Sequence, residues 1–592
     1  MCGIAGVFGR SDEKVVARML DALHHRGPDD GHIVSGPNFT MGTRRLSIID
    51  VGGGRQPLTN EDGSVFAAQN GEIYNFPALR RSLLEAGHQL RTHTDTEVLP
   101  HLWEDVGEAL PEHIQGMFAV AVWDARQQTG LLARDRMGKK PLYYWQSGGA
   151  LYFASELKAL LTIPGFSRRL KREALHHFLG YKHVPHPLTI FEGVSVLPPA
   201  HRLLFRPGSE PAISRYWTLS FCRSSPVPDE HEAVDELLAR LTTAVQRRLM
   251  SDVPIGFFLS GGIDSSLTVA LAAELAPRIK TFTLTYSDQA TTVGKEGDRQ
   301  WARWVAERYG TEHHEETISF AHYPETLPQI LRAFDEPFAG VTSTYFLSQR
   351  IAQYVKVAVA GDGADELFGS YLSHRLAAGM ESSPIVASQP DWMWRSSLLV
   401  LSDEEKAELY SPEARAQALF STAEHVRGAF DNLTGSDPLN RMLEAEWHGI
   451  FPDQVLTFVD RLSMAHSLEV RSAFLDTDVV EFVASLPGSM KIGGGLTKRL
   501  LKLAALRRFP EQMVHRPKEG FLMPITEWMR GDLRPWARET LGPSRLSQHG
   551  IFSPPDVQAL LDRLDDPGCD YRTVNKVLGL VIFQHWFEMY LA

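Results

Sequence analysis

Residues 253–266 read VPIGFFLSGGIDSS, and this stretch decides the fold of the larger part of the chain. The apolar run over 253–259 predicts a buried strand, a glycine-rich loop follows it, and residues 267–276 have a helix-forming pattern. Further strands are predicted at 281–286 and 355–360, with helical spacing between them. Fully apolar strands that alternate with helices are typical of a parallel α/β sheet covered on both faces. In such sheets, ligands bind at the carboxyl ends of the strands.

The loop at 260–266 is suited to a phosphate group. Its glycines let backbone amides approach an anion, its serines add hydroxyl donors, and the helix that follows favours negative charge at its N-terminus. The loop has no lysine, and Asp264 would repel phosphates unless a metal ion lay between them, so we predict that Asp264 binds Mg²⁺. A plain glycine turn that caps a helix is the structural alternative. The full string resembles the PP-loop of ATP pyrophosphatases, which cleave ATP to AMP and pyrophosphate.

A second loop, 361–369, follows the strand predicted at 355–360 and carries Asp362, Asp365 and Glu366. Three carboxylates in five residues are costly without a cation. An acidic surface turn is the structural alternative. The position at an equivalent strand end favours a second Mg²⁺ contact through Asp365.

Residues 1–207 have a different pattern, in which short apolar runs such as 116–123 lie between Gly, Asp and Asn turns. This pattern predicts two stacked sheets flanked by helices. A linker rich in Pro, Ser and Gly is expected between 207 and 229, and an amphipathic helix at 230–250.

Cys2 directly follows Met1. Removal of Met1 would leave a nucleophilic sulfur and a free α-amine on one residue. An α-amine titrates at about pH 7.7–8.0, so it can accept the thiol proton at neutral pH. A chance cysteine at position 2 is the alternative.

Composition excludes several classes of protein. The chain has 592 residues, 43% hydrophobic and 22% charged, which predicts two or three globular domains. A formal net charge of −12 argues against a general nucleic-acid binder. Three cysteines imply no disulfide framework and fit a reducing cytoplasm. No apolar run reaches the length of a membrane span, and the N-terminus does not read as a secretory leader.

Seven further motifs occur in order along the chain: RGPDD at 26–30, RLSII at 45–49, NGEIYN at 70–75, TDTE at 94–97, DRLSMAHSLEVR at 460–471, FLD at 474–476 and RPKEGF at 516–521. With Cys2 and the loop at 260–266, they resemble the glutamine-hydrolysing (class B) asparagine synthetase family. The resemblance implies an α/β protein with an N-terminal nucleophile (αββα) glutaminase domain over 1–210. A linker over 211–229 and a PP-loop ATP pyrophosphatase domain with a doubly wound parallel sheet over 230–592 would follow.

The resemblance implies that Cys2 is the glutaminase nucleophile. Asn70 and the backbone amide of Gly71 would form an oxyanion hole, because fixed donors stabilise the charge that develops in the tetrahedral intermediate. Asp95 would hold the α-ammonium group of glutamine. The residues expected to line the glutamine pocket are Arg45, Leu46, Ser47, Ile48, Ile49, Asn70, Gly71, Glu72 and Asp95. A structural Arg45–Asp95 ion pair is the alternative for those two side chains.

In the second domain the resemblance implies an ATP site. Its expected residues are Leu259, Ser260, Gly261, Gly262, Asp264, Ser265, Ser266, Leu284, Ala360, Gly361, Asp362 and Lys498. Lys518 would meet the acyl-adenylate as a point positive charge, and Lys498 is expected near pyrophosphate. Surface lysines are the alternative for both.

The implied reaction uses glutamine, Mg-ATP and aspartate. A carboxylate does not react with ammonia because oxide would have to leave, and adenylation replaces oxide with AMP. Ammonia released through a γ-glutamyl thioester at Cys2 would travel through an enclosed tunnel between the domains. The family also leaves open a homodimer.

Three features depart from the family pattern. Asp362 stands where some asparagine synthetases have Glu, residues 341–345 lack the Thr-Thr-Ile-Arg string of aspartate-using forms, and 377–439 has no clear counterpart. The first two lie near the expected acceptor pocket. The alternative therefore keeps the chemistry but amidates another carboxylate, such as a sugar acid, a peptide or an antibiotic precursor.

Other classes fit less of the chain. Ring-closing relatives usually lack Cys2, and a regulatory module would not need intact Asp264, Asp365 and Lys518. A stand-alone glutaminase would leave the PP-loop domain unexplained. PP-loop enzymes that modify tRNA share only residues 260–266.

Overall fold

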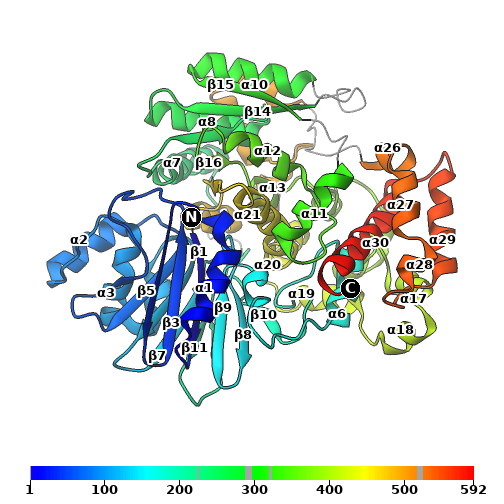
Figure 1. Ribbon diagram of the computed structural model, residues 1–592. Coiled ribbons are helices and arrows are strands. Elements are labelled where there is room, and N and C mark those ends of the chain that lie inside the picture. The colour runs from blue at the N-terminus through cyan, green and yellow to red at the C-terminus, as the bar shows by residue number, and fades with distance from the viewer. Residues whose placement is uncertain (1, 223–225, 287–295, 319–322, 517–524) are drawn as a thin grey trace.

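The computed structural model describes residues 2–222, 226–286, 296–318, 323–516 and 525–592 (Figure 1). An N-terminal unit, residues 2–215, contains two antiparallel sheets, and a C-terminal unit that begins at residue 230 is built around one parallel sheet. The two units lie against each other, with helix α21 (Thr457–Met464) between the first strand and the parallel sheet.

The first sheet carries Cys2 at the start of an inner strand. Its strand order is β10-β8-β9-β1-β3-β2. These strands are β10 (Val194–Val196), β8 (Tyr143–Ser147), β9 (Ala150–Ala154), β1 (Cys2–Phe8), β3 (Phe39–Arg45) and β2 (Asp30–Gly36).

The second sheet has the order β12-β11-β7-β6-β5-β4. Its strands are β12 (Ala212–Arg215), β11 (His201–Phe205), β7 (Thr129–Arg134), β6 (Gly116–Asp124), β5 (Val65–Ile73) and β4 (Leu58–Thr59).

The two sheets pack face to face around a buried aromatic core. Trp123 of β6 lies between Phe8 and Phe39 of the first sheet, with ring centroids 5.2 and 5.6 Å away. Helices α1 (Glu13–Ala22) and α5 (Leu157–Leu160) cover the outer face of the first sheet. Helices α2 (Phe76–Ala86) and α3 (Val98–Val106) cover the second. The αββα prediction is confirmed.

Strand β6 shows why its sequence is apolar without alternation. Ala121 and Trp123 face the first sheet, whereas Val120 and Val122 face the helices on the other side. Both faces of the strand are therefore buried, and both need apolar side chains.

The parallel sheet has the order β15-β14-β13-β16-β17. Its strands are β15 (Glu312–Ile318), β14 (Lys280–Tyr286), β13 (Ile255–Phe258), β16 (Val357–Ala360) and β17 (Glu469–Ser472). Strand β13 pairs with both β14 and β16. The loops at 260–266 and 361–369 therefore leave neighbouring strands at the same edge of the sheet, as the sequence predicts.

Helices cover both faces of this sheet, which confirms the doubly wound prediction. One face packs on α7 (Glu230–Arg248), α8 (Ile263–Leu275), α22 (Thr477–Ala484) and α24 (Arg499–Leu506). The other packs on α12 (Ser343–Ile351) and α21. Helix α7 begins with a capping box, in which Asp229 accepts from the backbone of Glu232 and Glu232 accepts from the backbone of Asp229.

The remaining α-helices are α4 (Leu110–His113), α6 (Arg172–Tyr181), α10 (Glu296–Tyr309), α11 (Tyr323–Phe334), α13 (Ala364–Phe368), α14 (Leu372–Ala377), α15 (Pro384–Ser388), α16 (Asp391–Ser396), α17 (Asp403–Leu409), α18 (Pro412–Gln417), α19 (Thr422–Ala429), α20 (Pro438–His448), α23 (Gly488–Lys491), α25 (Glu511–Val514), α26 (Ile525–Arg530), α27 (Arg534–Thr540), α28 (Pro543–Leu546), α29 (Pro554–Asp562) and α30 (Tyr571–Tyr590).

Strand β12 lies within the segment 211–229 that the sequence predicts as a linker. Its four residues, AISR, are too short for an apolar run or a clear alternation, and they pair with β11 at the edge of the sheet, where all four are exposed. The first part of that segment is thus sheet rather than linker.

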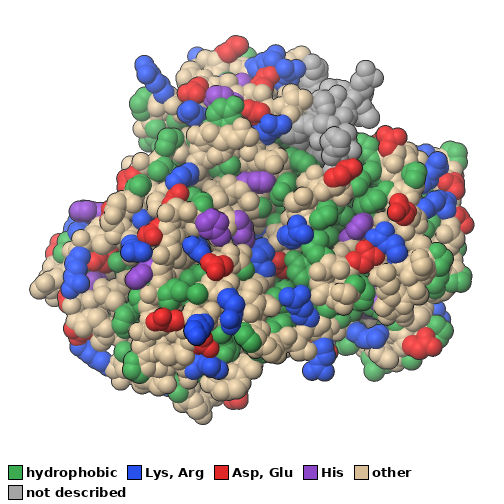
Figure 2. Space-filling model, in the orientation of Figure 1, with side chains coloured by type: hydrophobic (Ala, Val, Ile, Leu, Met, Phe, Trp, Pro, Cys, Tyr) green, Lys and Arg blue, Asp and Glu red, His purple; other side chains and the backbone are tan. Residues whose placement is uncertain are grey.

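Charged side chains of both signs are interspersed on the face drawn in Figure 2. Among the described residues, no helix combines the length and the apolar character that crossing a membrane requires.

Buried ion pairs join the two units. The guanidinium of Arg26 lies 2.7 Å from Glu156 and 2.9 Å from Asp460 of α21. Lys140 lies 3.1 Å from Asp460, and Arg461 lies 3.2 Å from Glu156. Burial raises the pKa of Asp460, but the charges of Arg26 and Lys140 outweigh it and lower that pKa to about 2.

We expect Asp460→Asn to lower the free energy of unfolding by about 3–5 kcal/mol, because it leaves Arg26 and Lys140 buried without their shared counter-charge. The matched control is Asp21→Asn, since Asp21 pairs with Arg44 at the surface with 72% of its side chain exposed. The control should change stability by no more than about 1 kcal/mol. Denaturant midpoints of the two full-length variants check this, and equal midpoints would contradict it.

Candidate active sites

Cys2 lies at a buried strand end with polar groups converging on it. Its side chain is on β1 opposite Arg45 of β3, and the residue is 4% exposed. Its backbone nitrogen donates to Asn70 Oδ1 at 3.3 Å, and its carbonyl accepts from Arg26 Nε at 3.3 Å. Gln56 Nε2 lies 3.9 Å from Sγ.

Burial raises the pKa of the Cys2 thiol, although a backbone hydrogen bond from Leu46 and the charge of Arg45 act against that shift. A thiol attacks as its thiolate, so it must first lose its proton. Attack by this sulfur requires a base beside it.

Asn70 and Gly71 of β5 provide donors close to Cys2. Asn70 Nδ2 is buried and makes no hydrogen bond with any described residue. Gly71 has φ +142°, and a Cβ there would lie 1.9 Å from the carbonyl oxygen of Met117. Only glycine fits this backbone, and an unpartnered amide beside a nucleophile is what an oxyanion hole requires.

Asp95 is a buried carboxylate held in place by three donors. Oδ2 accepts from Gln69 Nε2 at 2.7 Å and from the Ile73 backbone at 2.9 Å, and Oδ1 accepts from Thr94 at 3.2 Å. Burial raises its pKa, opposed by these hydrogen bonds.

Arg45 organises a loop instead of pairing with Asp95. Its guanidinium donates to the carbonyls of Ile49 at 2.9 Å, Asp50 at 2.7 Å and Val51 at 3.3 Å. Within the described part of the chain, Arg45 makes no ion pair with Asp95, so the structural alternative is not observed.

The same loop rests on the C-terminal unit. Leu46 and Ile48 pack against Val357 of β16 and Met464 of α21. The Ile48 carbonyl accepts from the backbone of Asp252 at 2.9 Å. The Ser47 amide instead donates to Asp29 within the N-terminal unit at 2.8 Å. The loop that carries the predicted glutamine-pocket residues therefore packs directly against the parallel sheet.

Glu72 lies at this interface too. Its Oε1 is 3.5 Å from Arg471 of β17. Burial and the charge of Glu469 raise the pKa of Glu72 well above its usual value.

The loop at 260–266 closes on itself through its own hydroxyl groups. Ser265 Oγ accepts from the Ser260 amide at 3.2 Å, and Ser260 Oγ accepts from the Gly262 amide at 3.3 Å. Gly261 has φ +76°, and a Cβ there would lie 2.1 Å from the carbonyl oxygen of Asp298. Ser266 Oγ is buried without a hydrogen-bond partner among the described residues.

Asp264 and Asp365 both contact the ammonium group of Lys498. Lys498 Nζ lies 2.6 Å from Asp264 Oδ2 and 2.8 Å from Asp365 Oδ1. Burial lowers the pKa of Lys498, but the two carboxylates outweigh burial and raise it. Asp264 Oδ1 is buried and has no hydrogen-bond partner in the described chain. The three predicted residues therefore come together, with the ammonium group between the two carboxylates.

Asp362 faces a lysine from the other unit. Lys139 Nζ is 4.0 Å from its Oδ2. Burial lowers the pKa of Lys139 to about 8, in spite of the Asp362 charge. Burial also raises the pKa of Asp362. Its carbonyl accepts from Ser472 Oγ at 2.6 Å.

The other predicted ATP-site residues lie at or beside this edge. Leu259 directly follows β13, Ala360 ends β16, and Leu284 belongs to β14. A Cβ on Gly361 would lie 3.1 Å from Asp264 Cβ, so the two loops touch. Lys518 lies outside the described residues. Arg516, two positions before it, donates to the Gly261 carbonyl at 3.0 Å.

A small cavity lies at the interface between the two units. It is lined by Tyr74, Gly116, Met117, Asp135, Met137, Lys139, Arg248, Ser472 and Leu475. Met117 contacts the Gly71 position, whereas Lys139 and Ser472 contact Asp362.

Sequence reasoning missed Gln56 and Lys139. Gln56 lies outside the quoted motifs, and its proximity to Cys2 depends on a loop fold. Lys139 is a single lysine in a loop, and only the docking of the units brings it to Asp362. The sequence holds no local signal for either contact.

Two family profiles match the chain: "Glutamine amidotransferase domain" over residues 1–217 and "Asparagine synthase" over residues 236–588. The glutamine-hydrolyzing asparagine synthetase 1 of Bacillus subtilis is 32% identical over 624 aligned residues, which cover 100% of this chain and 97% of that protein. A putative glutamine-hydrolyzing asparagine synthetase of Mycobacterium tuberculosis is 31% identical, with 100% and 96% covered. The B. subtilis asparagine synthetase 3 is 32% identical, with 90% and 89% covered.

We expect Gly71→Ala to destabilise the fold by at least about 2 kcal/mol more than Gly63→Ala, because its Cβ would collide with a backbone carbonyl as well as strain the backbone. Gly63 has φ +73° and nothing within 4 Å of a Cβ, so it reports the strain alone. Thermal unfolding of both variants measures the difference. A Gly71→Ala protein as stable as the control would contradict the packing at this site.

Proposed function

This chain belongs to the glutamine-hydrolysing asparagine synthetase family, and from that membership we propose that it transfers the amide nitrogen of glutamine to the side-chain carboxylate of aspartate at the expense of ATP. The observation that carries the proposal is that one chain holds two groupings of the expected residues: Cys2 with Asn70 in the N-terminal unit, and Asp264, Asp365 and Lys498 at the edge of the parallel sheet. Two half-reactions in one chain need a path for ammonia, and we propose that it runs through the interface of the two units, where the small cavity lined by Met117, Lys139 and Ser472 lies.

In the first half-reaction Cys2 Sγ attacks the γ-amide carbon of glutamine. Removal of Met1 would turn the Cys2 backbone nitrogen into the α-amine, and Asn70 Oδ1, 3.3 Å away, orients it as the base that takes the thiol proton. Asn70 Nδ2 and the Gly71 amide stabilise the oxyanion. The C–N bond then breaks, and the departing nitrogen takes the proton held by the α-amine and leaves as ammonia. Water hydrolyses the thioester to glutamate and the free thiol.

In the second half-reaction a carboxylate oxygen of the acceptor attacks the α-phosphorus of ATP. Backbone amides of the loop at 260–266 and the Ser266 hydroxyl bind the phosphates, and pyrophosphate leaves. Ammonia attacks the adenylated carbonyl carbon, and AMP departs with the bonding electron pair. Lys139, 4.0 Å from Asp362, would lie beside the proposed path of the ammonia.

Asp264 and Asp365 fit a divalent cation, and we propose that they hold Mg²⁺. Both present an oxygen to the Lys498 ammonium, and Asp264 Oδ1 has no other partner among the described residues. Carboxylate oxygens are the ligands that Mg²⁺ prefers. The ion would neutralise the phosphate charge of ATP.

Aspartate as the acceptor is the part of the proposal tested first. The experiment is acceptor-dependent release of pyrophosphate from Mg-ATP with glutamine present, for aspartate and for a panel of sugar acids, amino acids and peptides. Release with aspartate, together with asparagine and AMP, supports the proposal. Release with another acid alone keeps the chemistry and replaces the acceptor. Silence with every acid would overturn the ligase proposal.

We further propose a cytoplasmic location, because Cys2, Cys222 and Cys569 are all free thiols.

We expect Cys2→Ala to reduce glutamine-dependent synthesis by at least about 10³-fold, because the nucleophile is lost. Synthesis from added ammonia should persist, since the second site is untouched. The matched control is Cys222→Ala, which removes an exposed thiol and should change neither rate. Both rates are read from pyrophosphate release. Loss of ammonia-dependent synthesis in a folded Cys2→Ala protein would argue against two separable sites.

We expect Asp264→Asn to show the opposite pattern, since it removes a carboxylate proposed to bind the cation. Pyrophosphate release should fall by at least about 10²-fold with either nitrogen source, whereas glutamine hydrolysis should remain. Glutamate formation without ATP measures the second quantity. Equal loss of both activities would contradict the assignment.

A further inference from the structure

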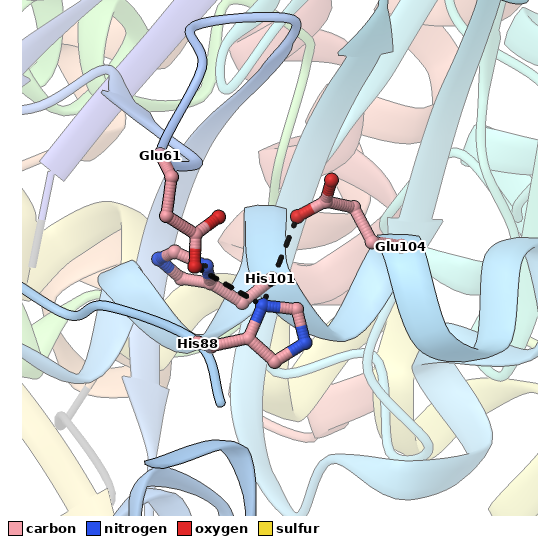
Figure 3. Close-up of side chains that lie close together, drawn as sticks. All are labelled: Glu61, His88, His101 and Glu104. Carbon is pink, nitrogen blue, oxygen red and sulfur yellow. Dashed lines mark hydrogen bonds and ion pairs between the residues drawn. The ribbon is translucent and has the colours of Figure 1, made fainter. Parts of the chain in front are cut away.

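A cluster of metal-ligating side chains lies away from both sites, on the outer side of the second sheet (Figure 3). It comprises Glu61, His88, His101 and Glu104. Glu61 lies in the turn between β4 and β5, His88 follows α2, and the other two belong to α3. One ligating atom from each of the four lies within 4.8 Å of the others.

Two of the distances between ligating atoms are close to those of a small tetrahedral ion, and the others are longer, up to 4.8 Å. Glu61 Oε1 is 3.2 Å from His88 Nδ1 and 3.3 Å from His101 Nδ1. His88 Nδ1 is 3.9 Å from Glu104 Oε2. A tetrahedral ion with ligands at about 2.0–2.2 Å places those ligands about 3.3–3.6 Å apart. The two contacts of Glu61 are thus near the required spacing, and Glu104, on a partly exposed side chain, would have to move closer to bind the ion.

His101 supplies the second, independent observation. It is 0% exposed, and neither ring nitrogen makes a hydrogen bond with any described residue. Its Nδ1 faces Glu61 Oε1, although the angle does not form a hydrogen bond. A buried imidazole without a hydrogen bond is costly unless another partner occupies the position.

His88 has the outer contact that metal-bound histidines commonly have. Its Nε2 lies 3.2 Å from Asp105 Oδ1. A proton on Nε2 directs the Nδ1 lone pair toward Glu61 and Glu104. Two acceptors facing each other repel, unless a cation lies between them.

We propose that Glu61, His88, His101 and Glu104 bind one Zn²⁺ ion in a structural site. Imidazole and carboxylate ligands favour zinc over Mg²⁺, which prefers oxygen. Four protein ligands leave no open position for a substrate, so the site is structural. It is separate from the proposed ligase reaction and stands without it.

The ion would link three segments near the predicted glutamine pocket: the turn between β4 and β5, the loop after α2, and helix α3. The backbone of Gln89, next to His88, donates to Glu61 at 2.7 Å. Asp95 lies between His88 and α3, and Glu97 accepts from the backbone of Thr92 at 2.7 Å. Fixing both ends of this segment restricts the position of Asp95.

A network of protonated histidine and carboxylates is the rival explanation. Burial lowers the pKa of His88, but Asp105 and Glu61 outweigh it and raise that pKa. Burial lowers the pKa of His101. A charged His88 would satisfy Glu61, but it would leave His101 without a hydrogen bond. The two explanations differ in metal content.

The experiment measures zinc bound to the full-length, untagged protein after dialysis, by elemental analysis and by calorimetric titration with Zn²⁺. The test variant is His88→Gln with Glu104→Gln. The matched control is His93→Gln, an exposed histidine of the same loop outside the cluster. The proposal expects one equivalent of zinc in the wild type and in the control, and one fewer in the test variant.

Thermal unfolding gives an independent reading if the double variant folds poorly. Zn²⁺ should raise the unfolding midpoint of the wild type by several degrees, EDTA should reverse the rise, and Mg²⁺ should not reproduce it. The single variant Glu104→Gln, on a partly exposed side chain, should weaken zinc binding at least tenfold. Equal zinc content and equal midpoint shifts in the wild type and Glu104→Gln would overturn the proposal and leave the protonated network.

Discussion

The charge of Arg26 is the constraint on which the rest of the structure depends. This guanidinium is fully buried, and its two carboxylate partners come from different units: Glu156 from the first and Asp460 from the second. A buried charge without its partners costs several kcal/mol. In either unit alone, these charged side chains would be exposed to water or buried without a partner. The two units therefore stabilise each other. Arg26 also donates to the Cys2 carbonyl, which connects Cys2 to the interface.

Helix α21 extends this dependence to both reaction sites. It carries Asp460, and its Met464 packs on Leu46 and Ile48 of the loop that Arg45 organises. One face of the same helix covers the parallel sheet. Strands β13 and β16 of that sheet end at the loops at 260–266 and 361–369. A shift of α21 would thus move the predicted glutamine pocket and the sheet together. This arrangement gives a physical route by which the two half-reactions can influence each other.

The sequence predicts the elements well and their docking poorly. Strands such as β6 and the loop at 260–266 are set by local apolar runs and glycines, so they can be identified from a few adjacent residues. The Arg26–Asp460 pair joins residues 434 positions apart, and no local pattern marks it. Lys139 and the Glu61–His88–His101–Glu104 cluster likewise arise only when separate loops meet. Exposed β12 has no apolar signal, so it resembles the linker in which we placed it.

The Asp264–Lys498–Asp365 contact shows that the fold maintains a cation between two carboxylates by its own means. Like charges this close cannot both stay ionised without a positive neighbour. Lys498 has φ +51°, a left-handed conformation that costs a non-glycine residue about 1–2 kcal/mol. Its amide donates to the Gly369 carbonyl at 3.2 Å, and its carbonyl accepts from Lys502 at 2.8 Å. These hydrogen bonds hold the backbone in that conformation, and the ammonium group lies between the two carboxylates. A divalent cation bound through Asp264 Oδ2 would share this position with Lys498 or displace it, whereas Asp264 Oδ1 has no hydrogen-bond partner among the described residues and could bind a cation beside the ammonium group.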